Sequence, residues 1–406
     1  MLASNWKSSR AQLNPIAPAP VTNPRFLLYS HDTCGLGNIR RTLLLAQELI
    51  EQYPKSAVLV VTGSQMIHSF RIPEGVDYIK LPCLDRIDAE RYESRFLLEC
   101  SEAVKNTRSS IIEKAVLGFE PDLMIVDKRP AGVDGELMDT LTALRERKLS
   151  SRLVLGIRDI LDEPSRSREL LKRNRSFEII KEYYDEVWIY GSQSIFDIVS
   201  EYEFPDEVAR ITHFCGYLKR PTLSVASHAG PPNVLVTPGG GGDGRSMIET
   251  YLEGLSNLPR NVALRSIVVF GPQMSLASRL DLSDRYSYLT DVEFREFEPD
   301  LTPLYAQADL VVSMAGYNTV CELLSFRRNA ILVPRSEPVK EQLIRARLLA
   351  AEGLFEMVEP QELSPDNLMA KVLRLLQPAA STPIRFDLQG LPRIRERTRE
   401  LLKENK

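Results

Sequence analysis

The chain has 406 residues, of which 43% are apolar and 26% charged, a balance typical of a globular protein with more than one domain. Its formal net charge of −4 argues against nucleic-acid binding, because a surface that follows a phosphate backbone needs a clear basic excess. Its five cysteines are widely spaced and include no Cys-x-x-Cys pair, so we expect neither a disulfide framework nor a metal site.

The first segment, residues 1–24, is rich in proline and is interpreted as a flexible lead-in. It lacks the apolar centre of a signal peptide, and no apolar run in the chain is long enough to cross a bilayer. The sequence therefore predicts a cytoplasmic protein.

The first half of the chain alternates between short apolar runs and helical patterns. A helix with one apolar side is predicted at 40–51. Strands are predicted at 26–30, 58–62, 122–127, 153–157 and 186–190. This order predicts an N-terminal domain, 25–218, with an open parallel sheet and helices on both faces. A connection rich in Pro, Gly and Ser follows at 219–232.

The second half repeats this alternation and predicts a C-terminal domain at 233–391. Strands are predicted at 233–237, 267–270, 292–297, 309–313 and 330–333. Helices are predicted near 246–256, 340–351 and 365–376, the last capped by Ser364. The charged segment 392–406 is predicted to be helical and to fold back on the first half. The fold class is therefore α/β, with two doubly wound domains facing each other.

A glycine-rich loop at 238–244 lies between a predicted strand and a predicted helix. Glycines let backbone amides approach an anion closely, and the helix N-terminus favours negative charge. The loop satisfies G-x-G-x-x-G through Gly239, Gly241 and Gly244. A dinucleotide site also needs an acidic residue at the end of the next strand, which here reads Phe270-Gly-Pro. An NAD site is therefore not expected.

The corresponding loop of the first half, 32–38, lacks the third glycine and has Arg40 in that position. We expect it to line the cleft between the domains through Gly35, Gly37 and Asn38. The alternative is a simple turn between strand and helix.

The segment 309–342 is the most informative part of the chain. A buried strand ending in Ser313, a small-residue turn at Gly316 and a helix carrying Glu322 would present backbone N–H groups and a carboxylate to one crevice. The pair Glu341-Gln342 opens another predicted helix. Such a site suits a phosphorylated sugar that carries a ribose.

The pattern Ala315-Gly-x-x-Thr-x-x-Glu322, followed by a strand ending in Pro and by Glu341-Gln342, resembles the donor domain of family 28 GT-B glycosyltransferases. The resemblance is specific over 233–355 and looser over 25–215. In the first half, Asp32 to Arg41 resembles a bacterial group of predicted glycosyltransferases. The resemblance implies the GT-B fold, two Rossmann-like domains around a central cleft, with an acceptor-binding N-terminal and a nucleotide-sugar-binding C-terminal domain.

The resemblance also implies roles for single residues. Glu322 would accept hydrogen bonds from the nucleotide ribose, although a solvent-facing glutamate is the alternative. Glu341 and Gln342 would reach the donor sugar. The residues implied to border the diphosphate are Gly239, Gly240, Gly241, Gly242, Gly316, Asn318 and Thr319, and Ser313 is a further donor-binding candidate. Arg335 is either a further donor to the leaving group or a surface residue.

The catalytic base is the point at which this chain departs from the family. The family's histidine after the first glycine loop is replaced by Asn38, which cannot act as a base. The candidates that remain are His31, Asp32 and Asp127. Asp127 or Asp159, each at the end of a later strand, could orient His31 or act directly, and the alternative for His31 is a structural role.

The resemblance implies transfer of a hexosyl or N-acetylhexosaminyl group from a UDP-sugar, or another nucleotide-diphosphate sugar, to an unknown acceptor hydroxyl. It further implies inversion, with no metal and no cofactor. The rivals are a nucleotide-sugar 2-epimerase and a non-catalytic sugar-nucleotide-binding subunit. The basic segment 166–175 is expected either to meet anionic lipid on the inner face of the membrane or a phosphorylated acceptor, or to be a solvated helix face. The oligomeric state stays open.

Overall fold

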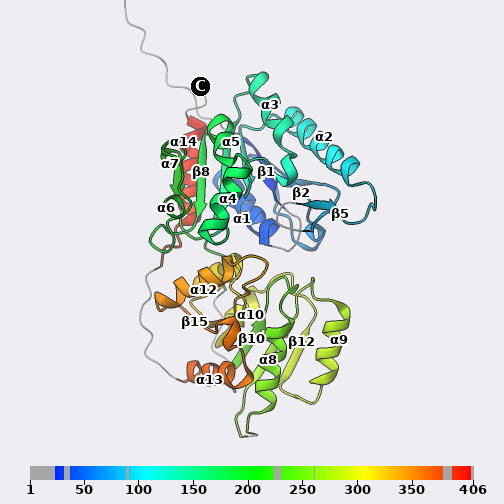
Figure 1. Ribbon diagram of the computed structural model, residues 1–406, viewed down its shortest axis with the longest axis vertical. Helices are drawn as coiled ribbons and strands as arrows, with labels where there is room; N and C mark the ends of the chain where they lie inside the picture. Colours follow the sequence, from blue (N-terminus) through cyan, green and yellow to red (C-terminus); the bar gives the residue numbers. More distant parts are fainter. Residues whose placement is uncertain are drawn as a thin grey trace, which may run out of the picture.

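The computed structural model describes residues 23–31, 37–87, 91–223, 230–259, 261–377 and 386–403. Two α/β domains lie one above the other in Figure 1, with helices on both faces of each sheet. The order of strands is β3-β2-β1-β6-β7-β8-β9 in the N-terminal sheet and β12-β11-β10-β13-β14-β15 in the C-terminal sheet. All neighbours in both sheets are parallel. The predicted α/β fold class, with two doubly wound domains, is thereby confirmed.

The N-terminal domain begins with β1 and ends with β9. Its strands are β1 Arg25–Ser30, β2 Ala57–Thr62, β3 Val76–Lys80, β4 Leu84–Arg86, β5 Tyr92–Ser94, β6 Leu123–Asp127, β7 Arg152–Arg158, β8 Glu186–Tyr190 and β9 Thr212–Phe214. Its α-helices are α1 Gly37–Gln52, α2 Ser101–Phe119, α3 Met138–Glu146, α4 Pro164–Arg173, α5 Ser176–Tyr183, α6 Ile198–Glu201 and α7 Asp206–Arg210.

The C-terminal domain begins with β10. Its strands are β10 Asn233–Thr237, β11 Arg265–Val269, β12 Val292–Arg295, β13 Leu310–Ser313, β14 Asn329–Leu332 and β15 Glu356–Met357. Its helices are α8 Arg245–Ser256, α9 Leu276–Arg285, α10 Thr302–Gln307, α11 Tyr317–Phe326, α12 Glu341–Ala351 and α13 Pro365–Leu375. One more helix follows, α14 Gly390–Lys403. None of the helices in the described ranges is both long and apolar enough to span a membrane.

The central strands are buried along their whole length because helices cover both faces of each sheet. All five residues of β6, β8 and β10 are buried, which explains their continuous apolar runs. At α13, Ser364 accepts a hydrogen bond from the backbone N–H of Asn367, and Pro365 occupies the first turn, where its missing N–H costs nothing.

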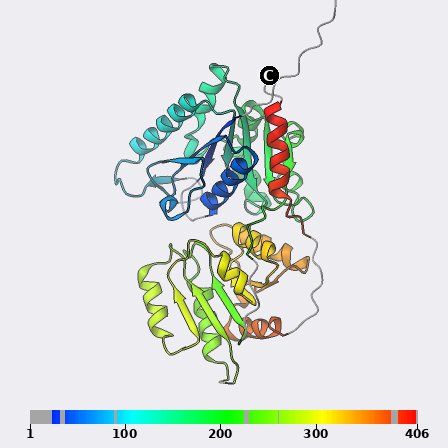
Figure 2. The same cartoon turned by 180° about the vertical axis from the view of Figure 1, so that it is seen from behind.

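Tyr217, at the end of the N-terminal domain, lies beside residues 387–390, which precede and begin α14. The N–H of Tyr217 donates to the carbonyl of Asp387 at 3.0 Å, and the N–H of Gly390 donates to the carbonyl of Tyr217 at 3.2 Å. Beyond this point α14 returns to the N-terminal domain, as Figure 2 shows. There Arg395 pairs with Glu48 of α1.

Candidate functional site

A cavity of about 1110 Å³ lies between the two domains, at the carboxyl ends of both parallel sheets. In doubly wound folds this is the edge at which ligands bind, because loops and helix N-termini gather there. The C-terminal wall of the cavity is formed by loops and helix starts between 238 and 342. The N-terminal wall is formed by residues between 37 and 176.

The glycine-rich loop supplies one edge of the C-terminal wall. Gly239, Gly240, Gly241 and Gly242 all line the cavity. Gly241 has a φ of +93°, and a Cβ there would come within 2.3 Å of the carbonyl oxygen of Phe270. The loop therefore requires glycine in order to pack against the end of β11 and leave its backbone open to the cavity.

The start of α11 supplies the second edge. Gly316, Asn318 and Thr319 line the cavity, and the first N–H groups of this helix have no partner inside the helix. An anion placed here would meet backbone donors and the positive end of the helix dipole. Ser313, by contrast, does not line the cavity. Its hydroxyl donates to the carbonyl oxygen of Thr237 at 2.5 Å and so joins β13 to β10.

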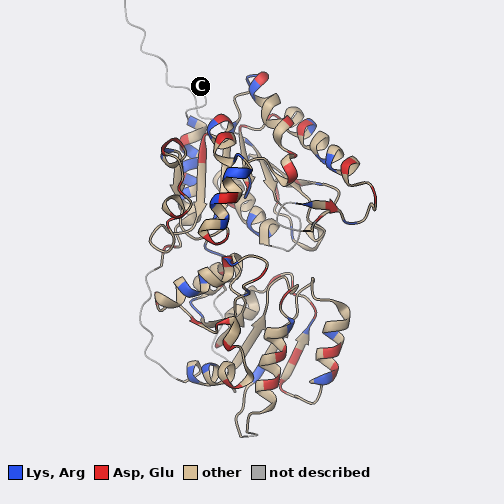
Figure 3. Ribbon diagram, in the orientation of Figure 1, with Lys and Arg blue, Asp and Glu red and all other residues tan. Residues whose placement is uncertain are grey.

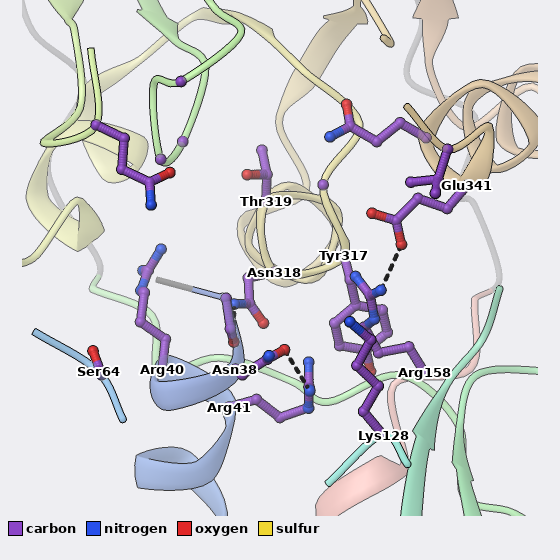
Figure 4. Close-up of a pocket in the computed structure, with 18 of the residues that line it drawn as sticks. Asn38, Arg40, Arg41, Ser64, Lys128, Arg158, Tyr317, Asn318, Thr319 and Glu341 are labelled. Atoms are coloured by element: carbon purple, nitrogen blue, oxygen red, sulfur yellow. Dashed lines mark hydrogen bonds and ion pairs between the residues drawn. The ribbon is translucent and has the colours of Figure 1, made fainter. Parts of the chain in front are cut away.

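The start of α12 brings Glu341 and Gln342 to the cavity, as the sequence indicated. Glu341 is buried and lies 2.7 Å from a guanidinium nitrogen of Arg158 in the N-terminal domain. Burial opposes its ionisation, but the charges of Arg158, Arg345 and Arg335 hold the pKa of Glu341 below its usual value. The group is therefore an ionised acceptor of hydrogen bonds, and Figure 4 shows it facing Arg158 and Lys128.

Glu322 lies deeper than the sequence suggested. Its side chain is 5% exposed and does not line the cavity, while Arg40 of α1 donates to it from the other domain. The helical glutamate is thus not solvent-facing, which removes that alternative. It is covered by a side chain that does line the cavity.

Arg335 also lines the cavity. It pairs with Asp243 of the glycine-rich loop and lies 3.6 Å from Glu341. It is therefore more than a surface residue after Pro334. The remaining C-terminal lining is partly apolar, with Val269, Phe297, Leu301 and Met314 beside the glycine-rich loop.

On the N-terminal wall, Gly37 and Asn38 line the cavity, whereas Asp32 and Gly35 lie outside the described residues. The amide of Asn38 is engaged on both sides, since it donates to the carbonyl of His31 and accepts from Arg41 at 3.1 Å. Arg41 in turn donates to Asp127. Asn38 therefore connects the start of α1 to the end of β1 directly, and to the end of β6 through Arg41.

His31 and Asp127 do not line the cavity. His31 is fully buried, with its ring edge-on to Tyr92 at a centroid distance of 6.4 Å. Asp127 is held by the buried guanidinium of Arg41. Their catalytic role, like that of Asp32, stays a prediction. In the described part of this domain the carboxylates that line the cavity are Asp134 and Asp162. They were missed because Asp134 lies in a short 3-10 helix after β6 and Asp162 in the loop after β7, where the sequence shows no periodic pattern.

Asp162 is engaged in joining the domains. It accepts from the backbone N–H of Lys340 at 2.8 Å, and Lys340 also pairs with Glu163. Arg166, the first residue of the basic cluster, donates to the carbonyl of Pro338 at 2.8 Å. Arg168 pairs with Glu203 on the surface. The sequence of α4 combines four basic residues with one acidic residue, and the ribbon in Figure 3 is coloured accordingly.

A buried ion pair joins the domains behind the cavity. Arg345 of α12 donates to both carboxylate oxygens of Asp159, at 2.7 and 2.8 Å, and to the carbonyl of Ala315 at 2.9 Å. The hydroxyl of Tyr217 donates to the same carboxylate at 2.9 Å. The guanidinium carbons of Arg41 and Arg345 each lie over the Tyr317 ring, 5.8 and 5.9 Å from its centroid. The described residues contain no group of three or more acidic, His or Cys side chains that could hold a metal.

Comparison with known proteins finds a family match that is confined to the C-terminal domain. Residues 234–386 match the family model of the glycosyltransferase family 28 C-terminal domain, which confirms the resemblance over this domain. A relative from Haemophilus ducreyi, named UDP-N-acetylglucosamine–N-acetylmuramyl-(pentapeptide) pyrophosphoryl-undecaprenol N-acetylglucosamine transferase, is 27% identical over 177 residues, 43% of this chain. The match spans about half of that relative, 48% of its length.

Solved structures extend the similarity of fold to nearly the whole chain. The structure of MurG from Acinetobacter baumannii is 14% identical, covers 94% of this chain and 99% of its own, and has a TM-score of 0.55. A putative UDP-N-acetylglucosamine 2-epimerase from Listeria monocytogenes is 12% identical, covers 92% and 95%, and has a TM-score of 0.58. At such identities these likenesses concern the fold alone.

Proposed function

We propose that this protein is a glycosyltransferase that moves a hexosyl or N-acetylhexosaminyl group from a UDP-sugar to an acceptor hydroxyl. The observation that carries the proposal is the C-terminal wall, where the glycine-rich loop, the start of α11 and Glu341-Gln342 border one cavity. This wall lies within the part of the chain that matches family 28, and the Haemophilus ducreyi relative is named for a UDP-N-acetylglucosamine donor.

Each part of a UDP-sugar has a matching surface on this wall. The diphosphate would lie between the glycine-rich loop and the start of α11, where backbone N–H groups and two helix N-termini favour negative charge. The uracil would lie against the apolar residues Phe297 and Leu301. The sugar hydroxyls would donate to the ionised Glu341 and contact the amide of Gln342.

The reaction would be a single displacement. The acceptor oxygen forms a bond to the anomeric carbon on the face opposite the diphosphate, which inverts the configuration. The bond from this carbon to the phosphate oxygen breaks, and its electron pair leaves with the diphosphate. The cations that line the cavity would neutralise that charge, so we propose that neither a metal nor a cofactor is needed.

The acceptor proton must pass to a base on the N-terminal wall. Of the two carboxylates that line the cavity in the described part of this domain, Asp162 is used between the domains. Asp134 pairs with Lys105 at 2.6 Å and keeps a third of its side chain exposed. We therefore propose Asp134 as this base, with Asp32 as the competing candidate.

The test combines ligand-dependent unfolding with product analysis. UDP and UDP-N-acetylglucosamine should raise the unfolding temperature as the logarithm of their concentration over the dissociation constant. Glu322→Ala should lose most of this rise, whereas Glu253→Ala, an exposed glutamate of α8 in the same domain, should retain it. Sugar-labelled UDP-N-acetylglucosamine should yield labelled acceptor and UDP.

Other products would favour the rivals. An epimerised nucleotide sugar formed without acceptor would identify a 2-epimerase. Binding of UDP without transfer or hydrolysis, over a panel of UDP- and dTDP-sugars and acceptors, would identify a non-catalytic subunit.

A further inference from the structure

We propose that Arg40 is an exchangeable cover on Glu322, and that its guanidinium moves onto the diphosphate when the donor binds. Arg40 would then stabilise the leaving group from the acceptor-binding domain. The inference rests on the proposed function, since it takes the nucleotide to be UDP and the ribose site to be Glu322.

The first observation is the order of the two side chains as seen from the cavity. Arg40 lines the cavity and is 21% exposed, whereas Glu322 is 5% exposed and does not line it. The Arg40 guanidinium donates to Oε1 of Glu322. Figure 4 shows Arg40 extending from α1 toward the helix that carries Asn318 and Thr319. A ribose could therefore reach Glu322 only after the Arg40 side chain has moved.

The second observation is that the domains do not depend on this contact. The amide nitrogen of Asn318 donates to the carbonyl of Gly37 at 2.7 Å. Arg220, in the segment that joins the domains, donates to the carbonyl of Arg40 at 3.2 Å and to the amide oxygen of Asn318 at 2.6 Å. These bonds hold the starts of α1 and α11 together through backbone and amide groups. The Arg40 side chain can leave Glu322 without opening the cavity.

The third observation concerns charge. Burial lowers the pKa of the Arg220 guanidinium, the neighbouring charge of Arg40 lowers it further, and the carboxylate of Glu322 opposes both. Arg220 therefore still balances Glu322 after Arg40 has left. The displaced Arg40 needs a new anion, because a guanidinium in a partly dry cavity is costly without a partner.

The diphosphate of the bound donor would supply this anion inside the cavity that Arg40 lines. Arg40 lines the cavity together with the glycine-rich loop and with Gly316, Asn318 and Thr319, which we propose border the diphosphate. A guanidinium fork matches phosphate oxygens in a bidentate manner. UDP would thus exchange one ion pair for another. The phosphate oxygen that gains the electron pair when the bond to the sugar breaks would face Arg40.

The exchange predicts opposite effects on ligands with and without phosphate. Calorimetry on the full chain would compare uridine, UMP and UDP for the wild type and for Arg40→Ala. Arg40→Ala should weaken UDP binding about tenfold or more, because a charge-assisted contact is lost. It should leave uridine binding unchanged or tighter, because uridine no longer has to displace a guanidinium. The turnover number for transfer should fall as well.

Controls separate this outcome from a loss of fold. Arg145→Ala removes a guanidinium that is 62% exposed on α3 and paired with Glu182, and should bind all three ligands like the wild type. Arg40→Lys keeps the charge without the fork and should fall between wild type and Arg40→Ala. The unfolding temperature of each variant without ligand verifies the fold.

The alternatives give different results. If Arg40→Ala weakens uridine and UDP by the same factor, Arg40 only shapes the pocket and the exchange is refuted. If UDP binding is unchanged, Arg40 does not reach the diphosphate. If the wild type binds none of the three ligands, the proposed function itself fails and the inference with it.

Discussion

The two walls of the cavity are built by different means. The C-terminal wall offers mainly backbone: a glycine-rich loop and the starts of α11 and α12, joined by Glu341 and Gln342. The N-terminal wall offers side chains, and several of them are already bound to one another, as Asn38 is to Arg41 and Arg41 to Asp127. A wall of backbone groups can receive any ligand with the right arrangement of charge, whereas a wall of paired side chains must exchange partners first.

The largest expected effect lies where the two walls are joined. Arg345→Ala would leave the carboxylate of Asp159 fully buried beside Tyr217, so we expect it to lower the free energy of unfolding by about 3–5 kcal/mol. Chemical denaturation measures this loss. Replacing both partners with apolar residues, as in Arg345→Met with Asp159→Leu, should recover much of it.

A matched control lies two residues further along α12. Arg347 is 53% exposed and pairs with Glu359, so Arg347→Ala should cost less than about 1 kcal/mol. Equal losses for the two arginines would mean that the pair behind the cavity does not hold the domains together. The contrast between the fixed Arg345–Asp159 pair behind the cavity and the exchangeable Arg40–Glu322 pair at its lining would then disappear.

The second prediction concerns which carboxylate of the N-terminal wall acts on the acceptor. Asp134→Asn should lower the turnover number at least about a hundredfold, because the amide cannot accept the proton. Donor affinity, measured as UDP binding, should not change. If Asp32→Asn has these effects while Asp134→Asn is silent, the role belongs to the first glycine loop.

The difference between the walls also explains what could be predicted from the sequence. The central strands and the helix start at Ser364 followed from apolar runs and capping signals, because local sequence determines them. The edge strands β3, β9 and β15 were missed. They are only partly buried, so their apolar pattern is weak.

The same argument applies to the site. The glycine-rich loop and the segment from Gly316 to Gln342 could be recognised because strand, turn and helix follow one another along the chain. The partners of Glu322, Glu341 and Arg345 could not, since Arg40, Arg158 and Asp159 lie in the other domain, 282, 183 and 186 positions away. The sequence carries no local signal for pairs that only the closure of two domains brings together.

The smallest expected effect tests the charged group of the C-terminal wall. The pKa of Glu341 is below its usual value of 4.5 in the folded protein, so the group stabilises the fold above that value. The stabilisation is lost as the pH falls through the lower, folded pKa.

Glu341→Gln should therefore cost about 1.5–3 kcal/mol at pH 7, the usual worth of a hydrogen bond to a charged group. Below pH 4.5 the difference between variant and wild type should shrink. Denaturation of both proteins across this range measures it. If the difference in unfolding free energy between wild type and Glu341→Gln stays constant with pH, the arginine neighbours do not keep Glu341 ionised. Glu341 and Gln342 would then present only neutral groups to a sugar.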